Sequence, residues 1–162
     1  MTGGIYRRCA GAIVFNSKGL VFLGKRINLS DAWQFPQGGI DEGETIESAS
    51  KRELYEETGI RHVKLIHTET TPIRYDFPNE IKKELAKKGR CFEGQDIYFS
   101  LFYFEGDERE IDFKLFEQEF DEYKWDNFDF AINKIINFKK DAYRLIAKKF
   151  EPLIFQYLKS LT

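Results

Sequence analysis

Apolar residues fall into short runs separated by turn-forming residues, which is the pattern of a chain with several strands. The almost continuously apolar run Arg8–Phe15 predicts a buried strand. The turn Asn16–Gly19 and the second apolar run Leu20–Lys25 predict that this strand continues into a hairpin. A short extended piece is expected at Trp33–Phe35, stopped by Pro36 and the Gly38–Gly39 pair. Further strands are expected at Val63–Thr70, Ile97–Phe104 and Glu122–Trp125, with an exposed acidic loop at Asp107–Glu110.

Two segments carry a helical pattern. Glu44 and Thr45 suit the first turn of a helix over Thr45–Thr58, and Gly59 is a natural stop. From Phe128 to about residue 160 the chain is expected to be mostly helical, with Pro152 kinking or interrupting the last helix. Apolar residues recur there at helical spacing, at Tyr143, Ile146, Ala147, Phe150, Ile154, Tyr157 and Leu158. Strands and helices in this irregular order predict an α/β or α+β sandwich, and residues 1–162 are expected to form one domain.

The helix predicted at Thr45–Thr58 places three carboxylates where it should face the protein. At ~100° per residue, Glu53, Glu56 and Glu57 fall within roughly a 100° arc, together with apolar positions such as Leu54. Buried together, these acids would repel one another and lose hydration unless cations neutralised them. The alternative is a solvated acidic stripe paired with neighbouring basic residues.

Two features beside the acids favour a functional site. A glycine-rich loop is expected at Gln37–Gly39, just before the helix, and it allows the backbone to approach a ligand closely. Arg52 can hold the carboxylates by forked hydrogen bonds. Carboxylate, carbonyl and water oxygens suit Mg²⁺ or Mn²⁺, ions that polarise phosphoryl oxygens and lower the pKa of bound water.

Charge and cysteine content narrow the classes of function. The chain has 25 Lys and Arg against 27 Asp and Glu, a net charge of -2, which is unlike a protein that coats nucleic acid in bulk. The basic run Lys82–Arg90 is either a solvated segment or a guide for an RNA chain.

Cys9 and Cys91 are expected to be free thiols, and no Cys/His cluster has zinc spacing. Met1–Arg8 lacks the apolar segment of a signal peptide and Ile97–Phe104 is too short to span a bilayer, so a cytoplasmic protein without membrane contact is expected.

The spacing of the acids and glycines resembles the Nudix box over the whole of Gly38–Ile60. That box reads Gly, five residues, Glu, seven residues, Arg-Glu, an aliphatic, one residue, Glu-Glu, one residue, Gly and an aliphatic. The matching positions are Gly38, Glu44, Arg52, Glu53, Leu54, Glu56, Glu57, Gly59 and Ile60. With residue frequencies of roughly 5–8%, seven fixed positions match by chance below about once in ten million windows. The resemblance implies a Nudix-type α/β/α sandwich with a mixed β-sheet.

The flanking segments resemble one subgroup of the Nudix family. Trp33–Ile40 is similar to the entry segment of the bacterial RNA 5′-pyrophosphohydrolases and the diadenosine tetraphosphate hydrolases of bacteria and plants. Other similar segments are Ile73–Pro78, Glu93–Gln95, Glu119–Asp121 and Phe138–Asp141. The chain departs from the subgroup at Asp96–Phe99, where a basic residue followed by Trp-Phe is usual, and in a longer tail after Phe150.

The resemblance implies a set of site residues. The implied metal ligands are Gly38, through its carbonyl, Glu53, Glu56, Glu57 and Glu119, with Mg²⁺ as the cofactor and Mn²⁺ as an alternative. Among the catalytic residues, Glu53 is the candidate to activate water, and Arg52 with Glu44 is expected to hold the acids in place. The implied substrate residues are Arg26, Tyr75, Phe138 and Lys139. For Tyr75 the alternative to stacking on a base is packing in the core, and for Arg26 and Lys139 the alternative is a solvated surface.

Four functions are compatible with the sequence, and two of them are favoured. The leading expectation is hydrolysis of a phosphoanhydride bond that removes pyrophosphate from the 5′-triphosphate end of RNA. The second is diadenosine tetraphosphate hydrolysis to ATP and AMP. A non-catalytic nucleotide-binding module is disfavoured because every carboxylate of the box is present, and a hydrolase of free nucleoside triphosphates is disfavoured by Trp33–Ile40.

Overall fold

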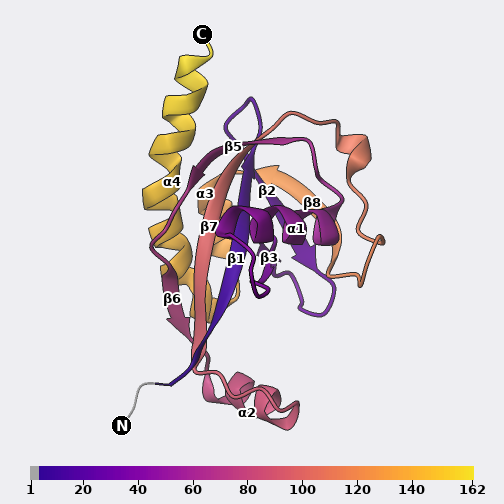
Figure 1. The fold of residues 1–162 in the computed structure, drawn as a ribbon. Helices are drawn as coiled ribbons and strands as arrows, with labels where there is room; N and C mark the ends of the chain where they lie inside the picture. The colour runs from indigo at the N-terminus through magenta and orange to yellow at the C-terminus, as the bar shows by residue number, and fades with distance from the viewer. Residues whose placement is uncertain (1–3) are drawn as a thin grey trace.

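The computed structural model describes residues 4–162 and has a mixed sheet between helices (Figure 1). The strands are β1 Tyr6–Phe15, β2 Val21–Arg26, β3 Trp33–Gln34, β4 Gln37–Gly39, β5 Val63–Thr68, β6 Ile73–Asp76, β7 Gly94–Phe104 and β8 Phe120–Asp126. The helices are α1 Ile46–Thr58, α2 Asn79–Lys87, α3 Phe128–Lys134 and α4 Lys140–Ser160, with 3₁₀ turns η1 Glu108–Glu110 and η2 Asn137–Lys139.

The sheet is built around β1 and β7, which run parallel in register from Tyr6↔Gly94 to Phe15↔Tyr103. The strand order is β3-β2-β1-β7-β5, with β4 paired to β1, β6 to β7 and β8 to β2, and these other pairings are antiparallel. The predicted mixed sheet is confirmed.

β1 is apolar throughout because both of its faces are covered. Ala12 and Val14 pack with Leu54 of α1 in one hydrophobic cluster. On the opposite face, Ile13 and Phe15 belong to a larger cluster that contains residues of α3 and α4. Figure 1 shows α1 on one side of the sheet and α3 and α4 on the other, so the predicted α/β/α sandwich is confirmed.

Helix α1 begins and ends where its terminal residues predict. Thr45 accepts a hydrogen bond from the backbone of Ser48, and the Ser48 side chain accepts one from the backbone of Thr45, which closes a capping box. Gly59 ends the helix in the left-handed conformation with φ 79°. The glycine-rich segment before the helix differs from its prediction, because Gln37–Gly39 forms β4 and pairs with β1.

The C-terminal segment is helical as predicted, but Pro152 does not interrupt it. Helix α4 runs unbroken from Lys140 to Ser160. Pro152 cannot donate to the carbonyl of Lys148, and both residues are exposed, so water can satisfy that carbonyl.

Among the described residues, no helix has the length and hydropathy needed to cross a bilayer. Cys9 is buried and Cys91 exposed, both as free thiols, while the signal-peptide expectation for Met1–Arg8 rests partly on residues outside the described range.

Candidate active site

The site lies where β1 separates from β2. Near Cys9 and Gly11 the partner of β1 is the short strand β4, which brings Gly38 to the start of α1. A β-carbon built on Gly38 would overlap the carboxylate of Glu53. Gly38 is therefore required by the close approach of the β4 backbone to that carboxylate.

Arg52 holds this corner together. Its guanidinium donates two hydrogen bonds to Glu44, at 2.8 and 2.9 Å, and one to the carbonyl oxygen of Gly39 at 2.8 Å. Its Nη1 donates to Glu53 at 2.9 Å and to Glu56 at 3.0 Å. These bonds join β4, the loop before α1 and the acidic face of α1, which is the positioning role expected for Arg52 and Glu44.

The three acids of α1 are graded in burial. Glu57 is buried, Glu53 is largely covered and Glu56 lies at the rim, with side chains of Glu53 and Glu56 13% and 34% exposed. Burial and the neighbouring Glu53 raise the pKa of Glu57 well above its ordinary value. Burial also raises the pKa of Glu53, against the opposing effect of Arg52. The inward-facing carboxylates predicted from the helical arc are therefore Glu53 and Glu57, of which Glu53 pairs with Arg52 and the buried Glu57 makes no ion pair among the described residues.

A fourth carboxylate approaches from another element. Glu119 directly precedes β8, and its carbonyl accepts a hydrogen bond from the backbone of Ile27 at 3.1 Å. Burial raises the pKa of Glu119, while the nearby Arg26 lowers it. The charge of Glu119 also contributes to the raised pKa of Glu57. The residue predicted from outside the box thus lies near the acids of α1.

The donor set fits a hard divalent cation, although the side chains are not drawn together around one point. In the described part of the chain no three Asp, Glu, His or Cys side chains converge closely enough to hold a metal. Arg52 draws Glu53 and Glu56 to itself, and Glu57 lies 3.4 Å from the backbone nitrogen of Gln37. Among the described residues, the one buried side-chain atom without a partner is Oε1 of Gln37. The backbone of the same residue approaches Glu57, and carboxylate and amide oxygens are the ligand type that Mg²⁺ prefers.

Three basic residues gather on the other side of this opening. Lys139 is buried, and Arg26 and Glu57 both influence its charge. Arg7 of β1 packs against Gly39, where an added β-carbon would meet its Nη2 at 2.7 Å. Over residues 4–162, Arg7, Arg26 and Lys139 make no ion pair with any carboxylate. Arg26 and Lys139 thus lie within electrostatic reach of Glu119 and Glu57, and cations of this kind can bind phosphate oxygens by charge-assisted hydrogen bonds.

Lys139 is not the solvated surface residue that was its alternative. It is 6% exposed, and its ammonium lies 5.3 Å from the ring centre of Tyr75. Burial lowers the pKa of Lys139 to about 8. Glu57 raises the pKa of Lys139 against the effect of burial, so the ammonium lies within electrostatic reach of that carboxylate.

Tyr75 lies in the hydrophobic core, which favours the packing alternative over stacking on a base. The residue is 8% exposed, and its hydroxyl donates to Oε1 of Gln95. Its ring packs against Phe138 at 5.7 Å and Phe77 at 6.2 Å between centres. The ring is thus packed against other aromatic rings and leaves little surface free. Phe138, the other predicted aromatic, is half-buried in the same group of rings.

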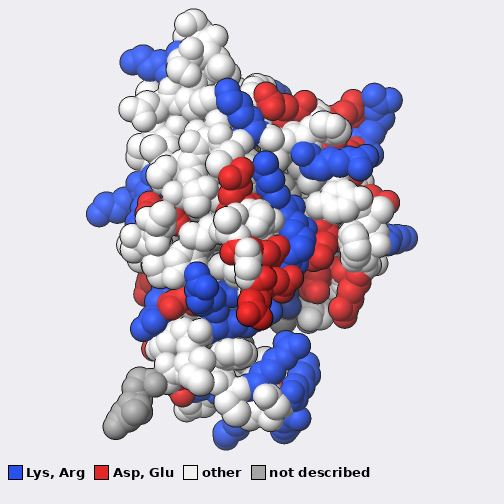
Figure 2. Space-filling view, viewed as in Figure 1, with Lys and Arg blue, Asp and Glu red and all other residues white. Residues whose placement is uncertain are grey.

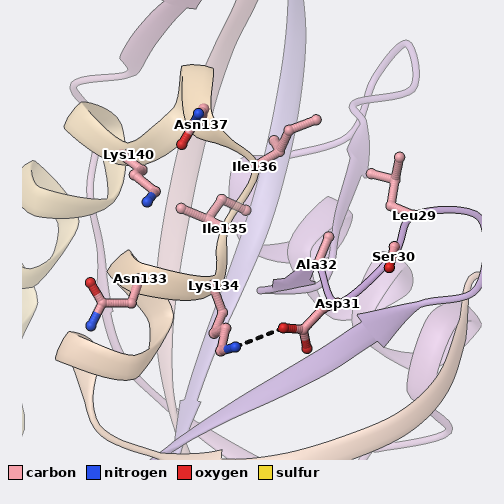
Figure 3. Close-up of a pocket in the computed structure, with 10 residues that line it drawn as sticks. All are labelled: Leu29, Ser30, Asp31, Ala32, Asn133, Lys134, Ile135, Ile136, Asn137 and Lys140. Atoms are coloured by element: carbon pink, nitrogen blue, oxygen red, sulfur yellow. Dashed lines mark hydrogen bonds and ion pairs between the residues drawn. The ribbon is translucent and has the colours of Figure 1, made fainter.

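A hollow of about 340 Å³ lies beside the site and away from the carboxylates. Figure 3 shows it between the loop after β2 and the segment that joins α3 to α4. Lys134 and Asp31 form an ion pair of 2.7 Å across one side of it. The hollow reaches Asn137, two residues before Lys139, and a second hollow on the other side of the same loop is lined by Arg26. The loop after β2 thus lines both hollows, and Arg26 lines the second of them.

Sequence reasoning missed two residues here, Arg7 and Gln37. Arg7 lies on the same face of β1 as the buried residues Cys9 and Ile13, because side chains alternate along a strand. A charged residue on a buried face could have indicated a functional role. Gln37 carried no signal beyond its place in the glycine-rich segment.

Comparisons with known proteins identify the family of this chain. The model of the NUDIX domain family matches residues 5–148. A protein of Erythrobacter litoralis named RNA pyrophosphohydrolase is 41% identical, and the alignment covers 92% of this chain and 93% of that protein. A protein of Bartonella quintana with the same name is 40% identical, with 90% of each chain covered.

Two solved structures share the fold. The dihydroneopterin triphosphate pyrophosphohydrolase of E. coli superposes with a TM-score of 0.66 at 19% identity, covering 87% of this chain and 96% of its own. An Ap4A hydrolase of C. elegans superposes with a TM-score of 0.60 at 18% identity, covering 96% and 97%. At these identities the likeness is one of fold. The family match and the full-length relatives together show that this chain belongs to the Nudix family.

Proposed function

We propose that this protein removes pyrophosphate, or successive phosphates, from the 5′-triphosphate end of RNA. The observation that carries the proposal is the covered acids Glu53 and Glu57 near Arg26 and Lys139, cations that make no ion pair among the described residues; Arg7, against Gly39, is taken to join them. Such a site neutralises a polyphosphate from both sides, through metal ions on the acids and directly through the cations. The choice of RNA rests on relatives named RNA pyrophosphohydrolase that match over nine-tenths of both chains.

In this proposal the α1 acids and Glu119 hold Mg²⁺, with Mn²⁺ as a substitute. Glu53, Glu56, Glu57 and Glu119 supply carboxylate oxygens, and Gly38 supplies its carbonyl oxygen. The bound ion supplies Lewis acidity, by lowering the pKa of water and neutralising the leaving phosphate. Arg52 acts as a positioning residue, since its hydrogen bonds set the orientation of Glu53 and Glu56.

The chain's own groups then divide the work of hydrolysis. Glu53 takes a proton from the attacking water, whose oxygen forms a bond to phosphorus as the bond to the leaving phosphate oxygen breaks. Lys139, Arg26 and Arg7 hold the non-reacting phosphate oxygens and keep the chain aligned for displacement. One water is consumed, and the products are a 5′-monophosphate end and pyrophosphate.

The second candidate substrate is diadenosine tetraphosphate, which offers the same polyphosphate and a nucleoside. The hollow beside Asn137 would accept the nucleoside of either substrate. RNA as substrate accords with a cytoplasmic location, which we propose as well. A binding module without turnover stays the alternative of another class.

Product analysis on both substrates tests the proposal. Purified protein with Mg²⁺ is given 5′-triphosphorylated RNA and diadenosine tetraphosphate in parallel, and the products are resolved. We expect a higher kcat/KM on RNA, with monophosphorylated RNA and pyrophosphate as products, and no turnover in excess chelator. A higher kcat/KM on diadenosine tetraphosphate would reassign the natural substrate, and no turnover on either would favour the binding module.

Glu53→Gln serves as the catalytic control in that experiment. It keeps the size of the side chain but removes the charge and the proton acceptor, so turnover should fall by several orders of magnitude, roughly 10²–10⁴ from the base alone. An unchanged melting temperature would show that the fold is intact. A near-normal rate would remove Glu53 from the catalytic residues.

A further inference from the structure

Helix α2 forms a basic arm at one end of the sheet. Asn79–Phe92, called the arm below, comprises α2 and the turn that returns to β7, and carries five basic and two acidic residues, a net charge of +3 in a chain of net charge -2. Figure 2 shows Lys and Arg side chains gathered over α2 at the lower end of the view. The same face of the molecule carries α1 (Figure 1).

The arm does not contribute to the hydrophobic core. No residue of α2 is buried, and no residue of the arm belongs to either hydrophobic cluster. Its base is fixed, because Phe77 donates its backbone hydrogen bond to Glu93 and Glu93 donates to Ile5, both at 2.8 Å. A fixed but exposed helix with little packing is positioned for contact with another molecule.

Three of the arm's cations are free to bind a partner. Lys82 pairs with Glu93 at 3.1 Å and Lys87 with Glu84 at 3.1 Å. Lys83, Lys88 and Arg90 are exposed and make no ion pair among the described residues. Unpaired exposed cations attract a polyanion, and their contribution falls as salt rises.

The register of β1 connects the arm to the site. Cys9 of β1 pairs with Gly39 beside the acids, and Tyr6 pairs with Gly94 at the base of the arm. Three residues of strand span ~10 Å, and a nine-residue helix adds at most ~14 Å. A stacked strand advances 3.4 Å per nucleotide, so about seven nucleotides beyond the 5′ end reach the far end of the arm.

We propose that the arm binds the phosphate backbone of the RNA that trails from the 5′ end in the site. This inference rests on the proposed function, and it assigns a place for the part of the substrate that the site itself does not contact. A dinucleoside polyphosphate has no trailing backbone, so the arm distinguishes RNA from that substrate by length.

The test compares two triple variants of equal charge change. K83Q/K88Q/R90Q removes the free cations of the arm, and K18Q/K148Q/K159Q removes three exposed lysines elsewhere. Kcat/KM is measured on a triphosphorylated RNA of about ten nucleotides, on a triphosphorylated dinucleotide and on diadenosine tetraphosphate. Binding of the same RNA with a 3′ fluorescent label is measured by anisotropy from roughly 50 to 200 mM salt.

Only the arm variant should lose activity and affinity on the long RNA, by tenfold or more at the low salt. Its salt slope should fall by about 2, since each contact on a single strand contributes about 0.7. The two short substrates should be unaffected. Equal losses on the dinucleotide, equal losses in the control variant, or unchanged binding of the long RNA would overturn the proposal, and the last result would point to an acidic protein as partner.

The two proposals fail in different ways. If wild-type protein binds the long RNA through the arm but does not hydrolyse it, the arm stands and the proposed function is wrong. If hydrolysis of triphosphorylated RNA is independent of length and of the arm substitutions, the function stands and the arm proposal is wrong.

Discussion

At the scale of single residues, one guanidinium decides how the acids are arranged. Arg52 reaches Glu44, Glu53, Glu56 and the carbonyl of Gly39, so its loss would free the rim of the site and the start of α1 together. The positioning role of Arg52 was predictable, because a forked donor next to clustered carboxylates has few other uses.

The bond from Arg52 to Glu44 predicts a dependence of stability on pH. Hydrogen bonds from Arg52 and the backbone of Asp41 lower the pKa of Glu44 from 4.5 to about 2. The ionised form is therefore stabilised by folding: the contribution is complete above pH 4.5 and is lost as pH falls toward 2. Glu44→Gln should lower the melting temperature at neutral pH. The melting temperatures of the variant and of wild type should converge as pH falls from 4.5 to 2. Substitution of the exposed Glu42 by Gln is the control, and it should change neither the melting temperature at neutral pH nor its dependence on pH. A difference in melting temperature between wild type and Glu44→Gln that stays constant down to pH 2 would contradict the stabilising role of ionised Glu44.

Tyr75 separates core packing from base stacking. Truncating this buried ring should cost about 3–5 kcal/mol of unfolding free energy in Tyr75→Ala. Tyr75→Phe keeps the ring and removes only the bond to Gln95, at a cost of about 1–3 kcal/mol. Urea unfolding measures both. A Tyr75→Ala variant that melts normally but shows a raised KM would restore the stacking role.

Other site residues were beyond prediction because their roles depend on distant parts of the chain. Lys139 reads as a surface lysine in its own segment, and only the packing of the 3₁₀ turn against Tyr75 buries it. Arg7 precedes the run that marks β1, and β4 brings Gly39 against it from about thirty residues away. Glu119 was predictable only through the family resemblance, since the run Glu117–Glu122 offers several equivalent acids.

At the scale of elements, the ends of a helix or strand were predicted correctly where residues at the end itself determine it. The Thr45 cap and the Gly59 stop bound α1 as predicted. β4 was missed because two glycines indicate a loop, whereas here the pairing with β1 makes them a strand. The start of β8 at Phe120 was missed for the same reason, since its partner β2 sets it.

A pair of glycine substitutions isolates what the end of α1 requires. Gly59 and Gly43 have similar φ angles of 79° and 84°, so alanine at either costs roughly 1–2 kcal/mol of backbone strain. A β-carbon at Gly59 would also lie 2.5 Å from the carbonyl oxygen of Glu110, while one at Gly43 meets nothing within 4 Å. Gly59→Ala should therefore lower the melting temperature by clearly more than Gly43→Ala. Equal decreases in melting temperature for the two variants would mean that the backbone at Glu110 moves away from the added β-carbon at little energetic cost.

At the scale of the whole molecule, the site is set into the sandwich at a cost in stability. Hydrophobic clusters on both faces of the sheet hold β1 in place. Beside β1, the carboxylate of Glu57 is buried close to the carboxylates of Glu53 and Glu119. Like charges in a buried place oppose folding. The hydrophobic clusters that fill both faces of the sheet offset this cost.

This conflict predicts how a metal ion and a single substitution change global stability. An ion that binds only the folded chain stabilises it by about 2.7 kcal/mol at one hundred times its Kd, a shift of roughly 5–10 °C in melting temperature for a domain of this size. Wild-type protein should therefore melt higher in Mg²⁺ than in chelator. Glu57→Gln removes the buried charge without changing the side-chain size, so in chelator it should melt above wild type, and Mg²⁺ should raise it little. Glu47→Gln on the outer face of α1, where Glu47 only pairs with Lys51, is the matched control and should keep the full response to Mg²⁺. A Glu57→Gln variant that melts below wild type in chelator and still responds fully to Mg²⁺ would show that Glu57 is a structural acid and not part of a metal site.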